Sequence, residues 1–237
     1  MVKADARNQG TISSVHHAFD VIEFLSEHGP ATVTEIAGTT GLPRPTLYRL
    51  LRTLGDRGIT RADRKRHGLS MRLHELGVRA NAVDVLQMQV QPILDRVVSA
   101  TGLTTHFAIR DGDSAVYIAK REGAAVLQMT TRVGWRAPLH CTATGKILMS
   151  AAGVPENLDL SPQTANTITD YETLVRDVER SMERGFALDD EEMLPGLRCV
   201  AVPVHEDSSI IGAVSVSGRS DQILDPAKLA ADIAALL

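Results

Sequence analysis

Residues 32–57, TVTEIAGTTGLPRPTLYRLLRTLGDR, decide the fold of the first part of the chain. We expect two short helices here, with a break at Gly41 and Pro43, because glycine adopts positive φ freely and proline cannot continue a helix. Thr34 is placed to cap the first helix. Pro45 suits the first turn of the second helix, where its missing N–H costs nothing. The second helix has one apolar face at helical spacing, made of Leu47, Leu50, Leu51 and Leu54. The stretch predicts a helix-turn-helix.

The opposite face of the second helix carries cations and hydroxyl groups. Such side chains suit phosphates and base edges in the major groove of DNA. They are Arg44, Thr46, Tyr48, Arg49 and Arg52. An ordinary solvated helix face has a similar composition, so these residues alone leave both interpretations open.

The segment before this stretch predicts a flexible arm and a further helix. Residues 1–11 are polar and predict the arm, and residues 12–28 predict the helix, which Ser13 or Ser14 would cap and Gly29 would end. Its apolar positions at helical spacing are Val15, Ala18, Phe19, Ile22 and Leu25.

A basic hairpin is expected directly after the helix-turn-helix, over residues 59–70, ITRADRKRHGLS. Ile59 and Leu69 would anchor it. Its tip carries Arg61, Arg64, Lys65 and Arg66. A hairpin in this position is typical of a winged helix, whose wing can contact phosphates or the minor groove. A solvated turn is the alternative. We therefore assign residues 12–72 to a winged helix-turn-helix that binds double-stranded DNA.

Composition and charge support a two-part chain. Its 237 residues suffice for two domains. Residues 1–80 hold 12 Lys or Arg and 8 Asp or Glu, a net charge of +4, whereas residues 81–237 hold 13 and 21, a net charge of −8. This asymmetry indicates a nucleic-acid module joined to an acidic partner domain. No apolar run approaches the roughly 20 residues that span a bilayer, and the N-terminus lacks a signal peptide, so we expect a cytoplasmic protein without membrane contact.

Residues 73–101 predict linker helices with an apolar stripe. The stripe consists of Leu73, Leu76, Val83, Leu86, Val90, Ile93, Leu94 and Val97. Pro92 should break or kink the run, or begin a second helix. An apolar stripe between domains needs a partner, and the same helix of a second subunit would supply it. The alternative is packing on its own chain.

Residues 102–237 mix strands and helices, which predicts an α+β domain. Strand character marks residues 101–110, 114–122 and 125–132, and residues 198–205 and 210–217 predict a hairpin. Helices are expected at 142–152, at 171–185 and at the C-terminus. The 171–185 helix would bury Leu174, Val178 and Met182.

Nearly end to end, the sequence resembles the IclR family of bacterial transcriptional regulators. The resemblance lies in LPRPTLYRLL at 42–51, RVGWRAPLHCTATGKILMSA at 132–151, RGFALDDEEMLPGLRCVAVPV at 184–204 and IIGAVSVSG at 210–218. It implies a winged helix, a linker helix and an effector-binding domain of GAF-like fold. It also implies homodimers, which can pair as tetramers on operator DNA, and an operator affinity that changes with a small metabolite. No cofactor is implied.

The resemblance also implies where an effector binds. Ala143, Thr144, Asp189, Cys199, Ser215 and Ser217 fall at ligand-contacting positions, and Met129, Leu139 and Leu197 would form the apolar wall. The residues themselves favour a small organic acid, because a helix start offers N–H groups to an anion. Ser215 and Ser217 alternate along one strand and so share one face. An ionised Asp189 would repel an acid, which favours a hydroxylated one.

Two other functions remain as alternatives. The first is a metal-responsive regulator using Cys141, Cys199 and His140, although the usual spacings of metal ligands are missing. The second is an enzyme using the same cysteine and histidine with Asp189 or Ser215. Adjacent residues on an extended stretch point to opposite sides, and no nucleophile elbow is present.

Overall fold

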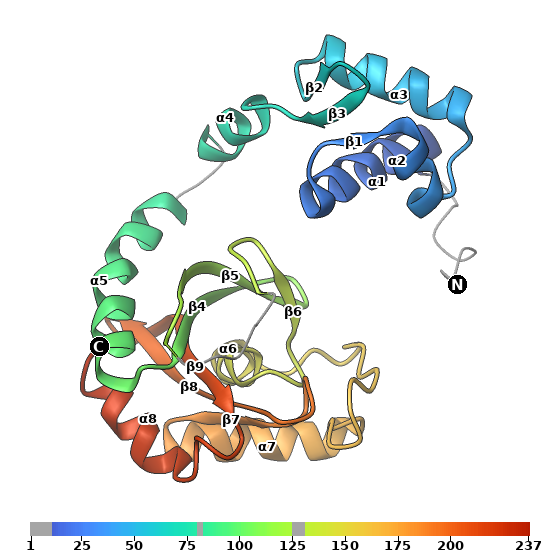
Figure 1. Ribbon diagram of the computed structural model, residues 1–237. Coiled ribbons are helices and arrows are strands. Elements are labelled where there is room, and N and C mark those ends of the chain that lie inside the picture. Colours follow the sequence, from blue (N-terminus) through green and yellow to red (C-terminus); the bar gives the residue numbers. More distant parts are fainter. Residues whose placement is uncertain (1–10, 80–82, 125–130) are drawn as a thin grey trace. The chain divides into compact units, whose positions relative to one another are not determined.

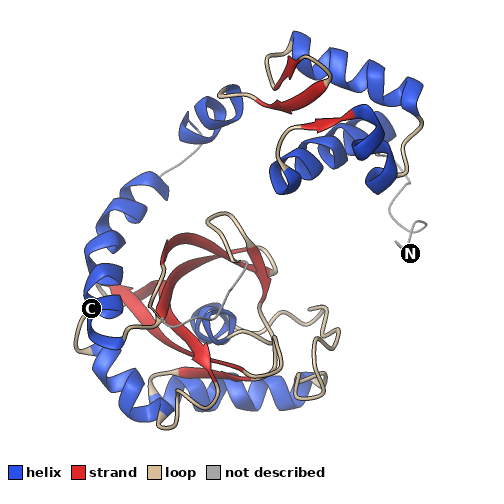
Figure 2. Ribbon diagram, in the orientation of Figure 1, coloured by secondary structure: helices blue, strands red, loops and turns tan. Residues whose placement is uncertain are grey.

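The computed structural model describes residues 11–79, 83–124 and 131–237. Its contacts divide the chain into two compact units, Met1–Asn81 and Ala82–Leu237 (Figure 1). Each unit has its own hydrophobic core, and the helices and strands of both are coloured in Figure 2. The predicted α+β fold is confirmed.

The N-terminal unit consists of three helices, a small sheet and a further helix. Its elements are α1 Ser13–His28, β1 Ala31–Thr32, α2 Val33–Thr40, α3 Arg44–Asp56, β2 Thr60–Asp63, β3 Arg66–Leu69 and α4 Arg72–Arg79. The sheet is antiparallel with the order β1-β3-β2. Helices α2 and α3 form the predicted helix-turn-helix, and β2 and β3 form the predicted wing.

The helix caps differ from those that the sequence predicts. Thr32, not Thr34, caps α2, because Thr32 Oγ1 accepts from the backbone N–H of Glu35 and the Glu35 carboxylate accepts from the backbone N–H of Thr32 at 2.6 Å. Ile12 stands at the N-cap of α1 without a side-chain cap, so neither Ser13 nor Ser14 has that role.

The apolar face of α1 agrees in part with the predicted one. Val21, Phe24 and Leu25 are buried against α2 and α3, whereas Val15 and Phe19 are 49% and 57% exposed. Ala18 and Ile22 pack against the same core, so the predicted face is confirmed at Ala18, Ile22 and Leu25 and is wrong at Val15 and Phe19. The α3 face is as predicted, with Leu50 half-buried and the other leucines, Leu47, Leu51 and Leu54, buried.

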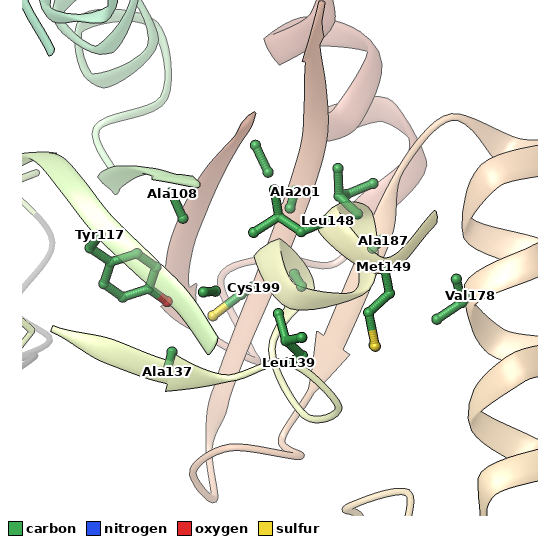
Figure 3. Close-up of a cluster of buried hydrophobic side chains, with 14 of the residues drawn as sticks. Ala108, Tyr117, Ala137, Leu139, Leu148, Met149, Val178, Ala187, Cys199 and Ala201 are labelled. Carbon is green, nitrogen blue, oxygen red and sulfur yellow. The ribbon is translucent and has the colours of Figure 1, made fainter. Parts of the chain in front are cut away.

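The C-terminal unit is built on one six-stranded antiparallel sheet with the order β6-β5-β4-β9-β8-β7. Its elements are α5 Val83–Thr101, β4 Thr104–Asp111, β5 Ser114–Arg121, β6 Arg136–Pro138, α6 Ala143–Ala152, α7 Tyr171–Arg184, β7 Ala187–Asp190, β8 Leu197–Glu206, β9 Ser209–Arg219 and α8 Pro226–Ala234. Helices α5 and α8 cover one face of the sheet. Helix α6 packs on the other face beside α7, and Figure 3 shows this second core.

Two features of these helices differ from the prediction. Pro92 lies inside α5 and neither ends it nor begins a second helix, and Val90, Leu94 and Val97 pack into the core on both sides of it. Met182 is 70% exposed. Ser181 is buried in its place, at the spacing that follows Leu174 and Val178 around α7.

The linker stripe therefore packs partly on its own chain. Val90, Leu94 and Val97 belong to the core of the C-terminal unit, and Leu86 packs against it. Leu76 and Met88 remain exposed. The strand predicted at 125–132 falls largely outside the described residues. In the parts of the chain that the structure describes, no helix is long and apolar enough to cross a membrane.

Candidate nucleic-acid interface and effector site

Helix α3 presents its polar face to solvent. Tyr48 is 60% exposed, Arg49 and Arg52 are exposed, and Thr46 is half-buried. Arg44 donates to Thr34 Oγ1 at 3.3 Å, so it also ties the start of α3 to α2. The hydrophobic packing of α2 on α3 leaves this cationic face free to enter a groove of DNA.

The wing tip is less uniform than its sequence suggests. Arg64 and Lys65 lie exposed at the turn between β2 and β3, with Arg64 at φ 54°. The Arg66 guanidinium instead donates two hydrogen bonds to Pro30 O, at 3.0 and 2.6 Å, and lies 3.5 Å from the Glu35 carboxylate. Arg66 thus fastens the wing to the segment before α2, which leaves Arg64 and Lys65 as the freer cations of the tip.

A small cavity lies at the N-terminus of α6. It measures about 30 Å³, the room of about one water molecule. Its lining comes from β5, the residue before β6, the start of α6, the end of β7, the turn after β7, and β8 and β9. The lining residues are Tyr117, Trp135, Thr142, Ala143, Thr144, Asp189, Met193, Leu197, Cys199 and Ser215. Figure 3 shows the side chains of Tyr117 and Cys199 beside α6.

Local packing fixes the start of α6 at this cavity. Thr142 Oγ1 accepts from the backbone N–H of Gly145 at 3.2 Å and donates to Pro138 O at 2.7 Å. A Cβ on Gly145 would lie 2.2 Å from Leu139 O, so only glycine permits this approach. No described residue accepts from the backbone N–H of Ala143 or Thr144. These two donors and the positive end of the helix dipole suit an anion.

Asp189 is the carboxyl group of the cavity, and it is fully buried. Its Oδ1 accepts the backbone N–H groups of Glu192 and Met193 at 2.8 and 3.2 Å. Its Oδ2 has no hydrogen-bond partner of good geometry among the described residues, and neither does the buried Thr144 Oγ1. The neighbouring groups are the Cys199 thiol, a weak donor that interacts with the Asp189 carboxyl, and the Tyr117 hydroxyl, which interacts with Thr144. Burial raises the pKa of Asp189 to about 7, although the two backbone hydrogen bonds oppose the rise.

A buried ion cluster supports the turn that carries Asp189. Lys146 Nζ, on α6, lies 2.5 Å from the Glu192 carboxylate and 2.7 Å from the Asp177 carboxylate on α7. It also donates to Leu188 O at 3.1 Å. Burial raises the pKa of Glu192, and Lys146 opposes that rise. The cluster joins α6, α7 and the segment after β7, and so holds the wall of the cavity in place.

The structure brings most of the predicted effector residues together. Ala143, Thr144, Asp189, Leu197, Cys199 and Ser215 all line the cavity. Leu139 is buried in the neighbouring core. Ser217 lies two residues after Ser215 on the same face of β9, and its Oγ is 3.2 Å from Cys199 Sγ. Met129 lies outside the described residues.

Sequence reasoning missed four lining residues, Tyr117, Trp135, Thr142 and Met193. The rings of Tyr117 and Trp135 are in contact, with their centroids 5.5 Å apart and their planes tilted by 47°. One signal was available for them, because the chain has one Trp and three Tyr, and two of those four lie here.

The proposed metal ligands do not form a site. His140 Nε2 is hydrogen-bonded to Ser161 O at 3.1 Å, and Cys141 Sγ donates to Met193 Sδ. Burial raises the pKa of the Cys141 thiol to about 12 and that of Cys199 well above its ordinary value, so both stay protonated. The described residues contain no group of three or more His, Cys, Asp or Glu that could hold a metal ion. Neither the metal-responsive regulator nor a thiolate enzyme is supported.

Both units match family models in sequence. Residues 14–64 match the IclR helix-turn-helix domain, and residues 80–236 match the bacterial transcriptional regulator IclR C-terminal domain. The chain belongs to the IclR family. It is a helix-turn-helix transcriptional regulator with an effector-binding domain, not an enzyme.

Relatives that align with most of the chain are transcriptional regulators by name. The chain is 34% identical over 230 residues to the HTH-type transcriptional regulator XynR of Escherichia coli K12, covering 92% of this chain and 90% of XynR. It is 32% identical over 229 residues to the regulator KdgR of the same organism, covering 92% of this chain and 86% of KdgR.

Solved IclR structures share the fold. The IclR of Thermotoga maritima aligns with a TM-score of 0.71 and 28% identity, covering 95% of this chain and 97% of the other. An IclR homolog from Microbacterium hydrocarbonoxydans, solved in complex with 4-hydroxybenzoate, aligns with a TM-score of 0.79 and 22% identity, covering 94% and 96%. At that identity the second likeness shows the fold alone.

Proposed function

We propose that this regulator binds operator DNA through α3 and the wing tip, in the cytoplasm, and that a small organic acid in the α6 cavity sets its operator affinity. On α3 the contacts are Arg44, Thr46, Tyr48, Arg49 and Arg52. On the wing they are Arg64 and Lys65, with Arg66 as an anchor of the wing. Bidentate arginine contacts to guanine supply specificity, and the wing cations supply salt-dependent affinity.

One observation carries the effector site, namely that two residues with unpartnered buried polar atoms line the same cavity. Asp189 Oδ2 and Thr144 Oγ1 have no hydrogen-bond partner among the described residues. An unpaired buried polar group costs about 1–3 kcal/mol. A ligand that pairs these atoms would recover that cost. The N–H groups at the start of α6 would receive the carboxylate of the ligand.

The size of the cavity limits the ligand or requires the lining to move. A volume of about 30 Å³ is too small for an acid of two or more carbons. Met193 is the lining side chain best suited to move, because it is half-buried at the surface and a methionine side chain is unbranched and flexible. The homolog from Microbacterium hydrocarbonoxydans binds 4-hydroxybenzoate, so hydroxylated aromatic acids belong in a ligand screen beside smaller ones.

A homodimer, able to pair into a tetramer, is part of the proposal. The support is exposed apolar side chains on each of two helices, namely Leu76 and Val78 on α4, and Val85 and Met88 on the first half of α5. Exposed apolar patches outside a domain core mark interaction sites. A two-fold dimer would match a pseudo-palindromic operator.

Selection of DNA from a random pool with the full-length chain, followed by footprinting, tests the DNA part. We expect one protected pseudo-palindrome, and Arg49→Ala should weaken its binding. An acid panel that leaves both operator affinity and melting temperature unchanged would exclude the effector part.

A further inference from the structure

We propose that the effector acid and Asp189 share one proton in the α6 cavity, so that binding of the carboxylate form takes up a proton from solution wherever Asp189 is ionised in the free protein. The inference rests on the proposed acid-binding function of this cavity. It adds the protonation state in which the site accepts its ligand, and it makes operator control dependent on pH.

The described lining of the cavity contains no cation. It has one acidic side chain, Asp189, and neither lysine nor arginine. The buried ammonium that interacts with Asp189 is that of Lys146. Its Nζ is already held by Asp177, Glu192 and Leu188 O. A bound carboxylate would therefore meet the Asp189 carboxyl without a positive charge to separate the two.

The geometry of Asp189 leaves one oxygen free for that proton. Oδ1 accepts two backbone N–H groups, whereas Oδ2 is buried without a hydrogen-bond partner among the described residues. Two carboxylates that share a desolvated site do not both ionise. With one proton between them, Oδ2–H donates to the ligand carboxylate and forms a strong charge-assisted hydrogen bond. The balance is one ligand carboxylate, one Asp189 carboxylate and one proton, with no other bond made or broken.

The neighbours of Asp189 on every element around it agree with this assignment. Glu192, from the turn after β7, raises the pKa of Asp189 and Lys146, from α6, lowers it, while burial outweighs both and sets the pKa at about 7. The remaining neighbours are Cys141, Cys199 and Tyr117. Burial raises the pKa of each of these three groups, so all are neutral at pH 7 and none supplies a countercharge.

The pH dependence follows from linkage. Below about pH 6, Asp189 already carries the proton in the free protein and acid binding is independent of pH. Above about pH 8, the proton must come from solution, so the affinity falls about tenfold for each pH unit. A neutral amide of the same shape donates to the ionised carboxylate and escapes this loss. The ratio of acid affinity to amide affinity therefore falls with pH.

Calorimetric titration of the full-length protein at pH 6, 7, 8 and 9 tests the proposal. The probes are glycolate, lactate, benzoate and 4-hydroxybenzoate, each beside its amide. Titrations at pH 8.5 in two buffers of different ionisation enthalpy count the protons taken up. Asp189→Asn keeps an acceptor for the backbone N–H groups and presents a permanent donor, so it should bind the acid with a Kd that does not change with pH. Asp113→Asn, at an exposed turn of the same unit, is the matched control and should keep the wild-type pH profile.

Uptake of close to one proton and a flat profile for Asp189→Asn would support the inference. Acid binding of equal strength at pH 6 and pH 9, or no proton uptake, would overturn it while the acid-binding function stands. If none of the acids binds the wild type at any pH and none changes operator affinity, the effector site itself is wrong and the inference falls with it. Thermal melts of both variants establish that they are folded.

Discussion

Lys146→Met should destabilise the C-terminal unit strongly and in a pH-dependent way. The side chain is 1% exposed and its ammonium pairs with Glu192 and Asp177. Methionine has a similar length and no charge, so the substitution leaves two largely buried carboxyl groups without their partner. Removal of one partner from a buried ion pair costs about 3–5 kcal/mol.

The pH dependence has a defined sign. The pKa of Glu192 is raised by burial and lowered by Lys146, so loss of Lys146 raises it further. A carboxyl group with a raised folded-state pKa stabilises the fold below its unfolded pKa, and that stability is lost as pH rises through the folded-state pKa. Lys146→Met should therefore lose most stability at pH 8 and recover part of it at pH 5.

Urea denaturation followed by tryptophan fluorescence measures this unit alone, because the chain has one tryptophan and Trp135 lies in the C-terminal unit. A loss of 3–5 kcal/mol at a slope of about 2 kcal/mol/M lowers the midpoint by about 1.5–2.5 M. Lys228→Met is the control, since Lys228 pairs with Asp232 at the surface, and it should leave the midpoint unchanged. A loss below about 1 kcal/mol, or an equal loss at pH 5 and pH 8, would refute the reasoning.

Three further predictions concern the DNA face, the cavity and the linker. Arg49→Ala should weaken specific operator binding by about 1–3 kcal/mol. Lys65→Ala should weaken binding to DNA of any sequence by a similar amount and flatten the salt dependence measured by fluorescence anisotropy. Equal effects of both variants on the binding of operator and of random DNA would contradict this division. Ser215→Ala should weaken acid binding in calorimetry without a change in melting temperature, and unchanged binding would place the ligand elsewhere. Met88→Glu should dissociate the dimer in light scattering without loss of stability, because Met88 is 67% exposed. Leu86→Glu should instead lower the urea midpoint, because Leu86 packs on the core of its own chain. A dimer that survives Met88→Glu would exclude this surface.

Sequence periodicity predicted the α3 leucine face well because burial on one side of a helix leaves a direct pattern. It failed on α1, where Val15 and Phe19 have the same apolar spacing as buried residues but extend beyond the core. Periodicity also failed at Met182, because the polar Ser181 takes the buried position. The Ser181 hydroxyl donates a hydrogen bond to Asp177 O within the helix, so the residue can be buried. Periodicity records which residues are apolar, not where the neighbouring element ends.

Most of the effector residues came from the family resemblance, and the structure explains why local sequence could not supply the rest. Thr142 and Met193 enter the cavity through the turns before α6 and after β7, whose course depends on the approach of Gly145 to Leu139 and on the Lys146 cluster. The contact between Lys146 and Glu192 joins residues 46 positions apart, and neither contact has a signature in a single sequence. The role of Arg66 was hidden likewise, because its acceptor, Pro30 O, lies 36 residues earlier.

Operator affinity with and without a bound acid tests the central claim most directly. The measurement is fluorescence anisotropy of the footprinted operator, titrated with wild type and with Asp189→Ala at pH 7, in the presence and absence of the tightest-binding acid of the panel. We predict that the acid shifts the wild-type Kd for the operator by at least about fivefold, as a coupling free energy of 1 kcal/mol or more requires, and leaves that of Asp189→Ala unchanged. An operator Kd that the acid does not change in the wild type, or changes equally in both proteins, would contradict the account.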